Sequence, residues 1–256
     1  MNVLIINSSN RINGNTAIAL KRYNDILTGN NYKTHIINLS KNNIKTCLGC
    51  RICFDKGEQN CPLNDDVKNI VKQMENTEIL LCGSPIYVED INGILKNFID
   101  RLAYNSHRPA FAGKYAYVLC TSGMGTSNHG ITTMERALQT WGFTIIGSAK
   151  YVTDAKISEK EFIKLYETKV HKGFKNIVKK INKNKKRVSF LSILFFTVQQ
   201  FYYRKKTDKN SFDYKYWENK GWINKNKHYY TEQKLNWVKV LIAEILTVII
   251  TKIVLK

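Results

Sequence analysis

The fold is decided by residues 3–16, which read Val-Leu-Ile-Ile-Asn-Ser-Ser-Asn-Arg-Ile-Asn-Gly-Asn-Thr. The four apolar residues at 3–6 form an uninterrupted β-prone run, as in a strand buried on both faces. Small polar residues follow, and Asn15-Thr16 opens a helix-prone run that continues to about Leu27. A buried strand, a polar loop and a helix make the first half of a β-α-β unit, so an α/β fold is predicted.

The alternation of strand and helix continues through the first 150 residues. Further strands are predicted at 34–39, 78–83, 115–121 and 144–152. One further helix is predicted to begin at residue 65, and others are predicted at 92–102, 126–141 and 159–183. Five short apolar strands separated by helices predict a doubly wound, five-stranded parallel sheet with helices on both faces. Such a sheet binds its ligand beyond the carboxyl ends of its strands, so the loops there are the places to look for chemistry.

The loop after the first strand has the donors that suit a phosphate. Ser9, Arg11, Asn15 and Thr16 supply hydroxyl, guanidinium and helix-start N–H groups. The glycine pattern of a dinucleotide fingerprint and the Gly-Lys-Ser/Thr of a Walker loop are both missing here. The alternative is an ordinary helix-capping turn rich in Asn and Ser.

Three stretches together resemble the NADPH-dependent FMN reductase family, a flavodoxin-like group. Residues 9–16 resemble its Ser-Pro-Arg-x-x-Gly-Asn-Thr loop, with Asn10 in place of the proline. Residues 83–87 (Gly-Ser-Pro-Ile-Tyr) with the helix 95–101, and the glycine-containing turn 121–126, resemble two further blocks of the family. In that helix, Lys96, Asp100 and Arg101 are predicted to form an ion-pair set on the helix surface.

The resemblance implies a flavodoxin-like fold that binds FMN. It places the phosphate of FMN on Ser9, Arg11, Asn15 and Thr16, and it places the isoalloxazine beside Pro85, Ile86, Tyr87, Ser122, Gly123, Met124 and Gly125. For Tyr87 the alternative is a ring that caps the core. No catalytic side chain is expected, because the flavin carries the chemistry.

Four cysteines form a compact motif in the loop predicted at 40–64. Cys47, Cys50, Cys53 and Cys61 have the spacing Cys-x2-Cys-x2-Cys-x7-Cys, and thiolates are the ligands of iron–sulfur clusters. The spacing resembles that of iron–sulfur flavoproteins, a branch of the same family, which implies a [4Fe–4S] cluster beside FMN and ferredoxin as an electron partner. Zinc and free thiols are the alternatives. Cys82 and Cys120 fall inside predicted strands and are expected in the core.

The positive charge is concentrated in the second part of the chain. The net charge is +20 overall, and residues 151–256 hold 24 basic and 9 acidic residues. Strand–helix alternation stops at the basic run 179–187, so residues 1–185, with a cysteine-rich loop at 46–62, are predicted as the FMN-binding domain. Residues 186–256 are then a basic, apolar, helical extension, with apolar stretches at 188–203 and 237–256. It suits either packing on the flavin domain or a second subunit, or an anionic membrane surface; no nucleic-acid module is recognised.

The sequence therefore predicts an FMN-dependent oxidoreductase, an enzyme that takes electrons from NAD(P)H or ferredoxin, and the family resemblance implies a homo-oligomer. A non-catalytic flavodoxin-type electron carrier and a membrane-surface module on a flavin scaffold are the alternatives. Residues 1–10 lack the features of a signal peptide, so we expect a cytoplasmic protein, with the extension as a route to the inner face of the membrane.

Overall fold

A computed structural model gives the structure of the chain and describes residues 1–125, 127–182, 188–205, 207–232 and 234–254. Its centre is a parallel sheet with the strand order β2-β1-β3-β5-β6. The strands are β1 (Asn2–Asn7), β2 (Lys33–Asn38), β3 (Ile79–Tyr87), β5 (Tyr115–Ser122) and β6 (Thr144–Val152), and the short β4 (Asp90–Ile91) pairs antiparallel with the end of β3. The predicted α/β class with five parallel strands is confirmed.

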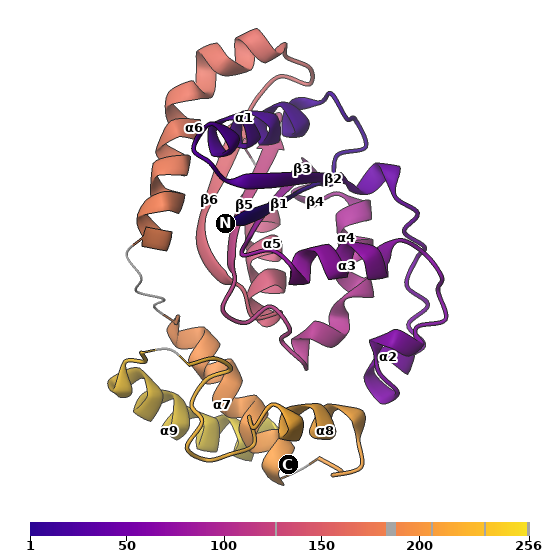
Figure 1. Cartoon of the computed structure of the whole chain (residues 1–256), viewed down its shortest axis with the longest axis vertical. Helices are drawn as coiled ribbons and strands as arrows, with labels where there is room; N and C mark the ends of the chain where they lie inside the picture. The colour runs from indigo at the N-terminus through magenta and orange to yellow at the C-terminus, as the bar shows by residue number, and fades with distance from the viewer. Residues whose placement is uncertain (126, 183–187, 206, 233, 255–256) are drawn as a thin grey trace.

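Helices α1 (Asn15–Gly29) and α6 (Glu159–Asn182) cover one face of the sheet (Figure 1). Beneath them, the buried Tyr23 hydroxyl lies 3.0 Å from the Tyr117 hydroxyl and 3.1 Å from that of Tyr151. A Cβ on Gly173 of α6 would lie 2.1 Å from the Tyr23 hydroxyl. The close approach of α6 to this tyrosine cluster therefore requires a glycine.

Helices α3 (Val67–Glu75), α4 (Gly93–Arg101) and α5 (Asn128–Thr140) cover the other face. Four short helical turns lie in the connections: η1 (Leu39–Lys41), α2 (Ile52–Asp55), η2 (Glu58–Asn60) and η3 (Ala103–Ser106). All eight residues of β5 are buried, as expected for a central strand covered on both sides. Cys82 and Cys120 lie in this core, which confirms their predicted burial.

The C-terminal extension is helical, as predicted, and packs below the sheet domain (Figure 1). It consists of α7 (Phe190–Lys205), α8 (Phe212–Asn219) and α9 (Trp237–Val254). These helices share an aromatic core in which Trp217 is fully buried and stacks on Phe196 and Tyr203, at ring-centroid distances of 5.6 Å and 4.8 Å. The C-terminal extension therefore has a hydrophobic core of its own.

Some element limits differ from those predicted. Strand β3 continues to Tyr87 rather than ending at Gly83, because residues 86–87 gain a partner in β4. Four predicted limits lie outside the described residues: the start of the helix 126–141, the end of the helix 159–183, the boundary between residues 185 and 186, and the end of the last helix at 255–256. Within the described ranges, no helix has the length and apolar character needed to cross a membrane.

Candidate functional site

The loops at the carboxyl ends of the strands meet along one edge of the sheet. Ser8 N donates to the Gly83 carbonyl at 3.0 Å, which joins the ends of β1 and β3. The hydroxyls of Thr16 and Thr121 lie 2.7 Å apart, which joins the start of α1 to the end of β5. The predicted phosphate and ring residues are therefore brought to the same edge, as a doubly wound sheet requires.

The N-terminus of α1 faces this edge without a side-chain cap. Gly14 occupies the N-cap position and supplies no side-chain oxygen, so the first N–H groups of the helix are left for another acceptor. The exposed Arg11 lies beside it, with Nη1 donating to the Ala155 carbonyl at 3.1 Å. Uncapped helix N–H groups with an adjacent guanidinium form an anion-binding arrangement, so the donor set fits the phosphate of FMN.

The side chain of Asn15 makes its hydrogen bonds within the protein. Its side-chain amide donates to Thr153 Oγ1 at 2.6 Å and to the Asp154 carbonyl at 2.7 Å. The side chain therefore holds the segment after β6 against the start of α1, and the backbone N–H of Asn15 is the group left to face an anion. The loop at 153–155 is part of the site edge, and the sequence interpretation had not included it.

Asn92 is a second residue that the sequence interpretation missed. This buried side chain lies 2.8 Å from Ser8 Oγ, donates to the Ser8 carbonyl at 2.6 Å and lies 3.2 Å from Ser84 Oγ. It therefore locks the loop after β1 to the turn at Pro85. A buried asparagine at the start of the predicted helix 92–102 was the only signal of this role.

The hairpin that ends β3 presents Tyr87 to the solvent. Val88 and Glu89 both have positive φ, at 49° and 68°, in the turn position that normally takes Asn or Gly. A β-branched residue in this region is strained, and such strain gathers at functional sites. Gly130 of α5 supports the hairpin, since a Cβ there would lie 2.3 Å from Ile86 Cδ1.

The glycine-containing turn after β5 is open. Ser122 Oγ accepts a hydrogen bond from Gly125 N at 3.2 Å, and Gly125 has φ +77°. A Cβ on Gly123 would meet only the Thr153 carbonyl, at 4.0 Å. The backbone can therefore be approached closely here, as a flat ligand would need.

An exposed apolar rim follows the same edge. It consists of Ile12, Tyr87, Val88, Met124 and Val152, of which Val88 is 99% and Met124 89% exposed. Tyr87 is 47% exposed, so it does not cap the core. Anion donors beside exposed apolar side chains suit a ligand with a charged end and an apolar ring.

The cysteine loop, residues 43–64, leaves the sheet domain through a stem fixed by side chains. Three backbone N–H groups donate to side-chain oxygens: Asn43 to Asp66 (2.7 Å), Lys45 to Asp65 (2.9 Å) and Cys47 to Asn97 (3.1 Å). Asp65 and Asp66 lie at the start of α3, and their carboxylates reach back to hold the loop.

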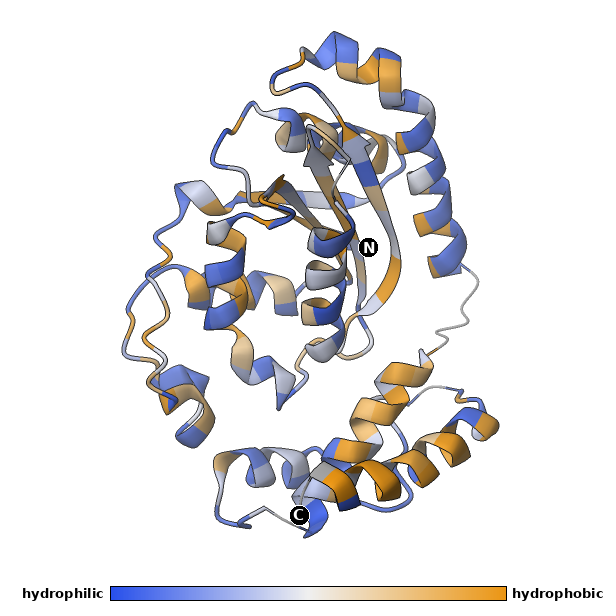
Figure 2. Cartoon of the chain, turned by 180° about the vertical axis from the view of Figure 1, so that it is seen from behind, coloured by the Kyte–Doolittle hydropathy of each residue, from blue (hydrophilic) through white to orange (hydrophobic). Residues whose placement is uncertain are grey.

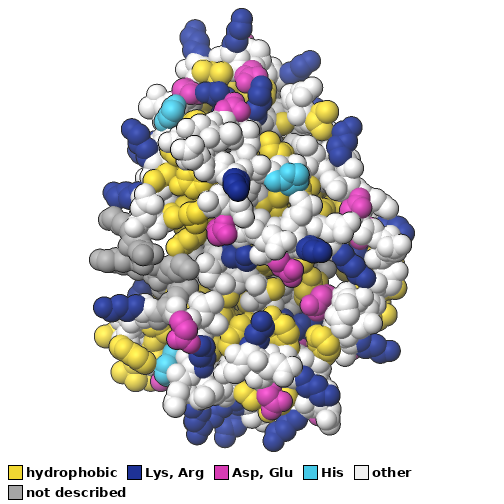
Figure 3. Space-filling model, viewed as in Figure 1, with side chains coloured by type: hydrophobic (Ala, Val, Ile, Leu, Met, Phe, Trp, Pro, Cys, Tyr) yellow, Lys and Arg dark blue, Asp and Glu magenta, His cyan; other side chains and the backbone are white. Residues whose placement is uncertain are grey.

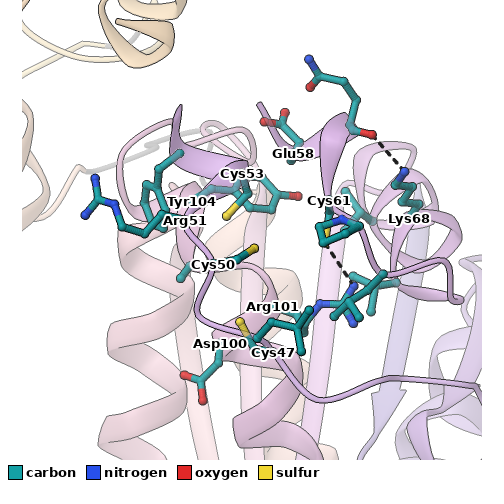
Figure 4. Close-up of a pocket in the computed structure, with 18 of the residues that line it drawn as sticks. Cys47, Cys50, Arg51, Cys53, Glu58, Cys61, Lys68, Asp100, Arg101 and Tyr104 are labelled. Atoms are coloured by element: carbon teal, nitrogen blue, oxygen red, sulfur yellow. Dashed lines mark hydrogen bonds between the residues drawn. The ribbon is translucent and has the colours of Figure 1, made fainter. Parts of the chain in front are cut away.

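Arg101 is buried beneath the cysteine loop, which makes its predicted place in a surface ion-pair set wrong. It pairs with the Asp65 carboxylate, donates to the Lys45 carbonyl at 2.9 Å and places Nη2 3.8 Å from Cys61 Sγ (Figure 4). Burial alone would raise the pKa of Asp65, but hydrogen bonds from Arg101 and two backbone N–H groups outweigh it and lower that pKa. Lys96 and Asp100 do form the predicted exposed pair, at 2.6 Å.

Arg108 ties the cysteine loop to the C-terminal extension. Its Nη2 donates to the Cys53 carbonyl at 2.6 Å and to Glu58 at 2.9 Å, and its Nη1 pairs with Asp213 of α8. The Phe212 ring lies 4.9 Å from the guanidinium carbon. Arg108 is almost fully buried, so this cation is held by two elements that are far apart in the sequence.

His107 completes this contact. Its Nδ1 lies 2.7 Å from Asp213 Oδ2, and its carbonyl accepts from Trp217 Nε1 at 2.7 Å. Burial raises the pKa of Asp213, but the His107 hydrogen bond and the Arg108 charge outweigh it, so that pKa lies below its ordinary value. His107 therefore links the segment after α4 to α8.

The four cysteines line one cavity of about 520 Å³, bounded by the loop, α3 and Arg101 (Figure 4). Cys47 and Cys50 are exposed, and Cys53 and Cys61 are half-buried. Burial, followed by the neighbouring Cys61 thiol, raises the pKa of Cys53. Across the described ranges, no three His, Cys, Asp or Glu side chains lie close enough together to hold a metal ion. Four thiols are the right kind and number of ligands for an iron–sulfur cluster. To bind such a cluster, the cysteine loop would have to move inward and bring the four sulfur atoms closer together.

Residues 1–156 match the NADPH-dependent FMN reductase family. The chain belongs to this family. Its distant relatives include an iron-sulfur flavoprotein of Archaeoglobus fulgidus, 29% identical over 150 residues, which are 58% of this chain and 67% of that protein. An iron-sulfur flavoprotein of Methanocaldococcus jannaschii is 32% identical over 101 residues, which are 40% of this chain and 51% of that protein.

Solved structures show the same fold at low identity. RosB, crystallised with 8-demethyl-8-formylriboflavin-5'-phosphate, has a TM-score of 0.51 and 13% identity, covering 62% of this chain and 67% of its own. A flavone reductase has a TM-score of 0.52 and 11% identity, and the match covers 67% of this chain and 59% of the flavone reductase. The fold is therefore flavodoxin-like. As a member of the FMN reductase family, the chain is a flavin-dependent oxidoreductase.

Proposed function

We propose that the strand-end loops bind FMN and that the protein oxidises NAD(P)H through it. The first N–H groups of α1, with Ser9, Arg11 and Thr16, would hold the phosphate. The side chains at 85–87 and the turn at 122–125 would border the ring. Bound FMN supplies transfer of one or two electrons. The observation that carries the proposal is the meeting of an uncapped helix start and an apolar rim on one edge of the sheet.

The phosphate half of this proposal is tested by comparing two flavins. Apoprotein is titrated with FMN and with riboflavin, which has the same ring but no phosphate, and flavin fluorescence is followed. Tighter binding of FMN, by at least about tenfold, is expected because charge-assisted hydrogen bonds are lost with the phosphate. Equal affinity for the two flavins would contradict a phosphate site at α1.

The reductase half is tested by turnover. The FMN-loaded protein is mixed with NADPH or NADH and with a quinone or free flavin as acceptor, and nucleotide absorbance is followed. Oxidation that depends on protein concentration supports a reductase. Bound FMN without turnover by either nucleotide would instead favour a non-catalytic carrier, or a protein reduced by ferredoxin, which is then tested as the donor.

We further propose that Cys47, Cys50, Cys53 and Cys61 hold a [4Fe–4S] cluster. Their spacing, their shared cavity and the similarity of the chain to iron-sulfur flavoproteins support it. Such a cluster supplies single-electron chemistry. The protein is purified without oxygen and assayed for iron, acid-labile sulfide and zinc. Equal amounts of iron and sulfide support the cluster; zinc alone, or no metal, would reject it.

A further inference from the structure

Helix α9 places its small and hydroxyl side chains inward. Ala243, Thr247 and Thr251 recur every four residues, are buried and face α7. The hydroxyls of Thr247 and Thr197 of α7 lie 2.8 Å apart. Val240 is buried on the same face of α9. Small residues and hydroxyl pairs at such a contact let two helices approach closely, as at helix contacts in lipid.

The opposite face of α9 is apolar and open. Eight large side chains lie on it, each between 44% and 71% exposed: Trp237, Val238, Leu241, Ile242, Ile245, Val248, Ile249 and Ile253. We call these eight residues the α9 face. Figure 2 shows α9 as a strongly hydrophobic helix at the lower edge of the molecule, and Figure 3 shows hydrophobic side chains exposed over that region. A contiguous patch of this kind on a protein surface marks an interaction site.

Helix α7, which packs on α9, also exposes apolar side chains. Leu191 and Phe195 of α7, one helical turn apart, are 55% and 52% exposed. Lys239 and Lys252 lie on α9 itself, and lysine can keep its ammonium in water while its stem lies along an apolar surface. Glu244, the acid within α9, is 3.2 Å from His228. The surface therefore combines apolar side chains with flanking cations.

Charge decides between lipid and a second copy of the chain. Residues 188–256, which include the C-terminal helices, hold 12 basic and 5 acidic residues. Two such extensions repel each other, whereas an anionic bilayer attracts them. A helix with one face packed on protein and an apolar outer face beside lysines suits the interface of a membrane, with its axis in the membrane plane.

We propose that the α9 face docks the protein on an anionic phospholipid surface. The helix keeps its inner face against α7, so only the eight outer side chains and their neighbours on α7 enter the interface. The flavin edge and the cysteine loop belong to other elements and stay in water. This inference is independent of the flavin chemistry, because it depends on the C-terminal helices alone.

The test is sedimentation of the full-length protein with lipid vesicles. Binding to vesicles of phosphatidylglycerol mixed with phosphatidylcholine is compared with binding to phosphatidylcholine alone. We expect at least about tenfold stronger binding to the anionic vesicles, weakened by added salt. Ile245→Glu should reduce that binding at least about tenfold, because a charge is placed in the apolar face.

The matched control is Leu165→Glu, which adds the same charge at an exposed apolar position of α6 and should leave binding within about twofold. Far-UV circular dichroism shows that both variants are folded. Failure of the wild type to sediment with anionic vesicles would overturn the proposal, as would equal loss in the two variants. So would a dimer that Ile245→Glu dissociates while vesicle binding stays unchanged.

Discussion

The flavin edge and the cysteine loop are organised by different means. At the flavin edge, loops after β1, β3, β5 and β6 are joined directly to one another through Ser8, Asn92, Thr16 and Asn15. The cysteine loop leaves the sheet and is held from outside, by Arg101 below it and Arg108 beside it. The sheet therefore builds the first site by itself, whereas the second depends on two buried cations and on α8.

This difference explains why the two sites should fail separately. The contacts at the flavin edge do not include Arg108 or the extension, and those of the cysteine loop do not include the start of α1. Substitutions in one region should therefore leave the other intact.

The largest effect is expected from removing the thiols. Replacing Cys47, Cys50, Cys53 and Cys61 by serine should lower protein-bound iron to background, because hydroxyls are poor ligands for an iron–sulfur cluster. The affinity for FMN should stay within about twofold of the wild type, since additivity holds for distant sites. Iron assay and flavin titration are made on the same sample.

Cys120→Ala is the control, because Cys120 is a buried core thiol away from the loop. It should keep its iron. Iron retained in the serine variant would show that these cysteines do not hold it, and loss of FMN in that variant would mean that the two regions are not separate.

Asp213→Asn should have the next largest effect. It leaves the buried Arg108 with the partly exposed Glu58 as its remaining charged partner, and breaking a buried pair costs about 3 kcal/mol of folding free energy. Urea unfolding measures the loss, with Asp208→Asn as an exposed control that should change stability by less than about 0.5 kcal/mol. An unchanged midpoint for Asp213→Asn would show that the extension does not support the loop.

The same pair predicts a dependence on pH. The pKa of Asp213 is lowered in the folded protein, so its contribution is present above the ordinary aspartate pKa of about 3.9 and is lost as pH falls through the folded value. The stability difference between wild type and Asp213→Asn should therefore be constant near neutral pH and shrink below about pH 4. A difference that grows in acid would have the wrong sign.

Arg11→Ala should lower the affinity for FMN by roughly tenfold and the affinity for riboflavin by less than about twofold, because the guanidinium interacts with the phosphate. Arg51→Ala, which removes an exposed arginine of the cysteine loop, is the control and should leave both affinities unchanged. Equal weakening of both flavins by Arg11→Ala would place Arg11 away from the phosphate.

The smallest effect is expected at Val88. Val88→Gly should raise the free energy of unfolding by about 1 kcal/mol, since glycine adopts the positive φ of the turn without strain. Leu165→Gly in α6 is the control with the opposite expected sign. It should lower the free energy of unfolding by about 1 kcal/mol, because glycine has a low helix propensity. Loss of stability in Val88→Gly would show that the turn is not strained.

The sequence predicted the parallel sheet, the edge that carries the loops and the family, because these follow from short apolar strands and local motifs. It did not predict that Arg101 is buried or that Arg108 pairs with Asp213. Those pairs join residues 36 and 105 positions apart, and a charged residue on a predicted helix ordinarily faces water. Asn92 was missed for the same reason: its partners come from loops that only the folded sheet brings together.

The flavin content of the protein purified without oxygen tests the central claim most directly. Flavin released by denaturation is identified and counted against protein, after incubation of the native protein with excess FMN and removal of the unbound part. We expect one FMN for each chain, with absorption bands near those of free flavin. Protein that retains no FMN, while circular dichroism shows it folded, would contradict the flavin edge and the redox function that depends on it.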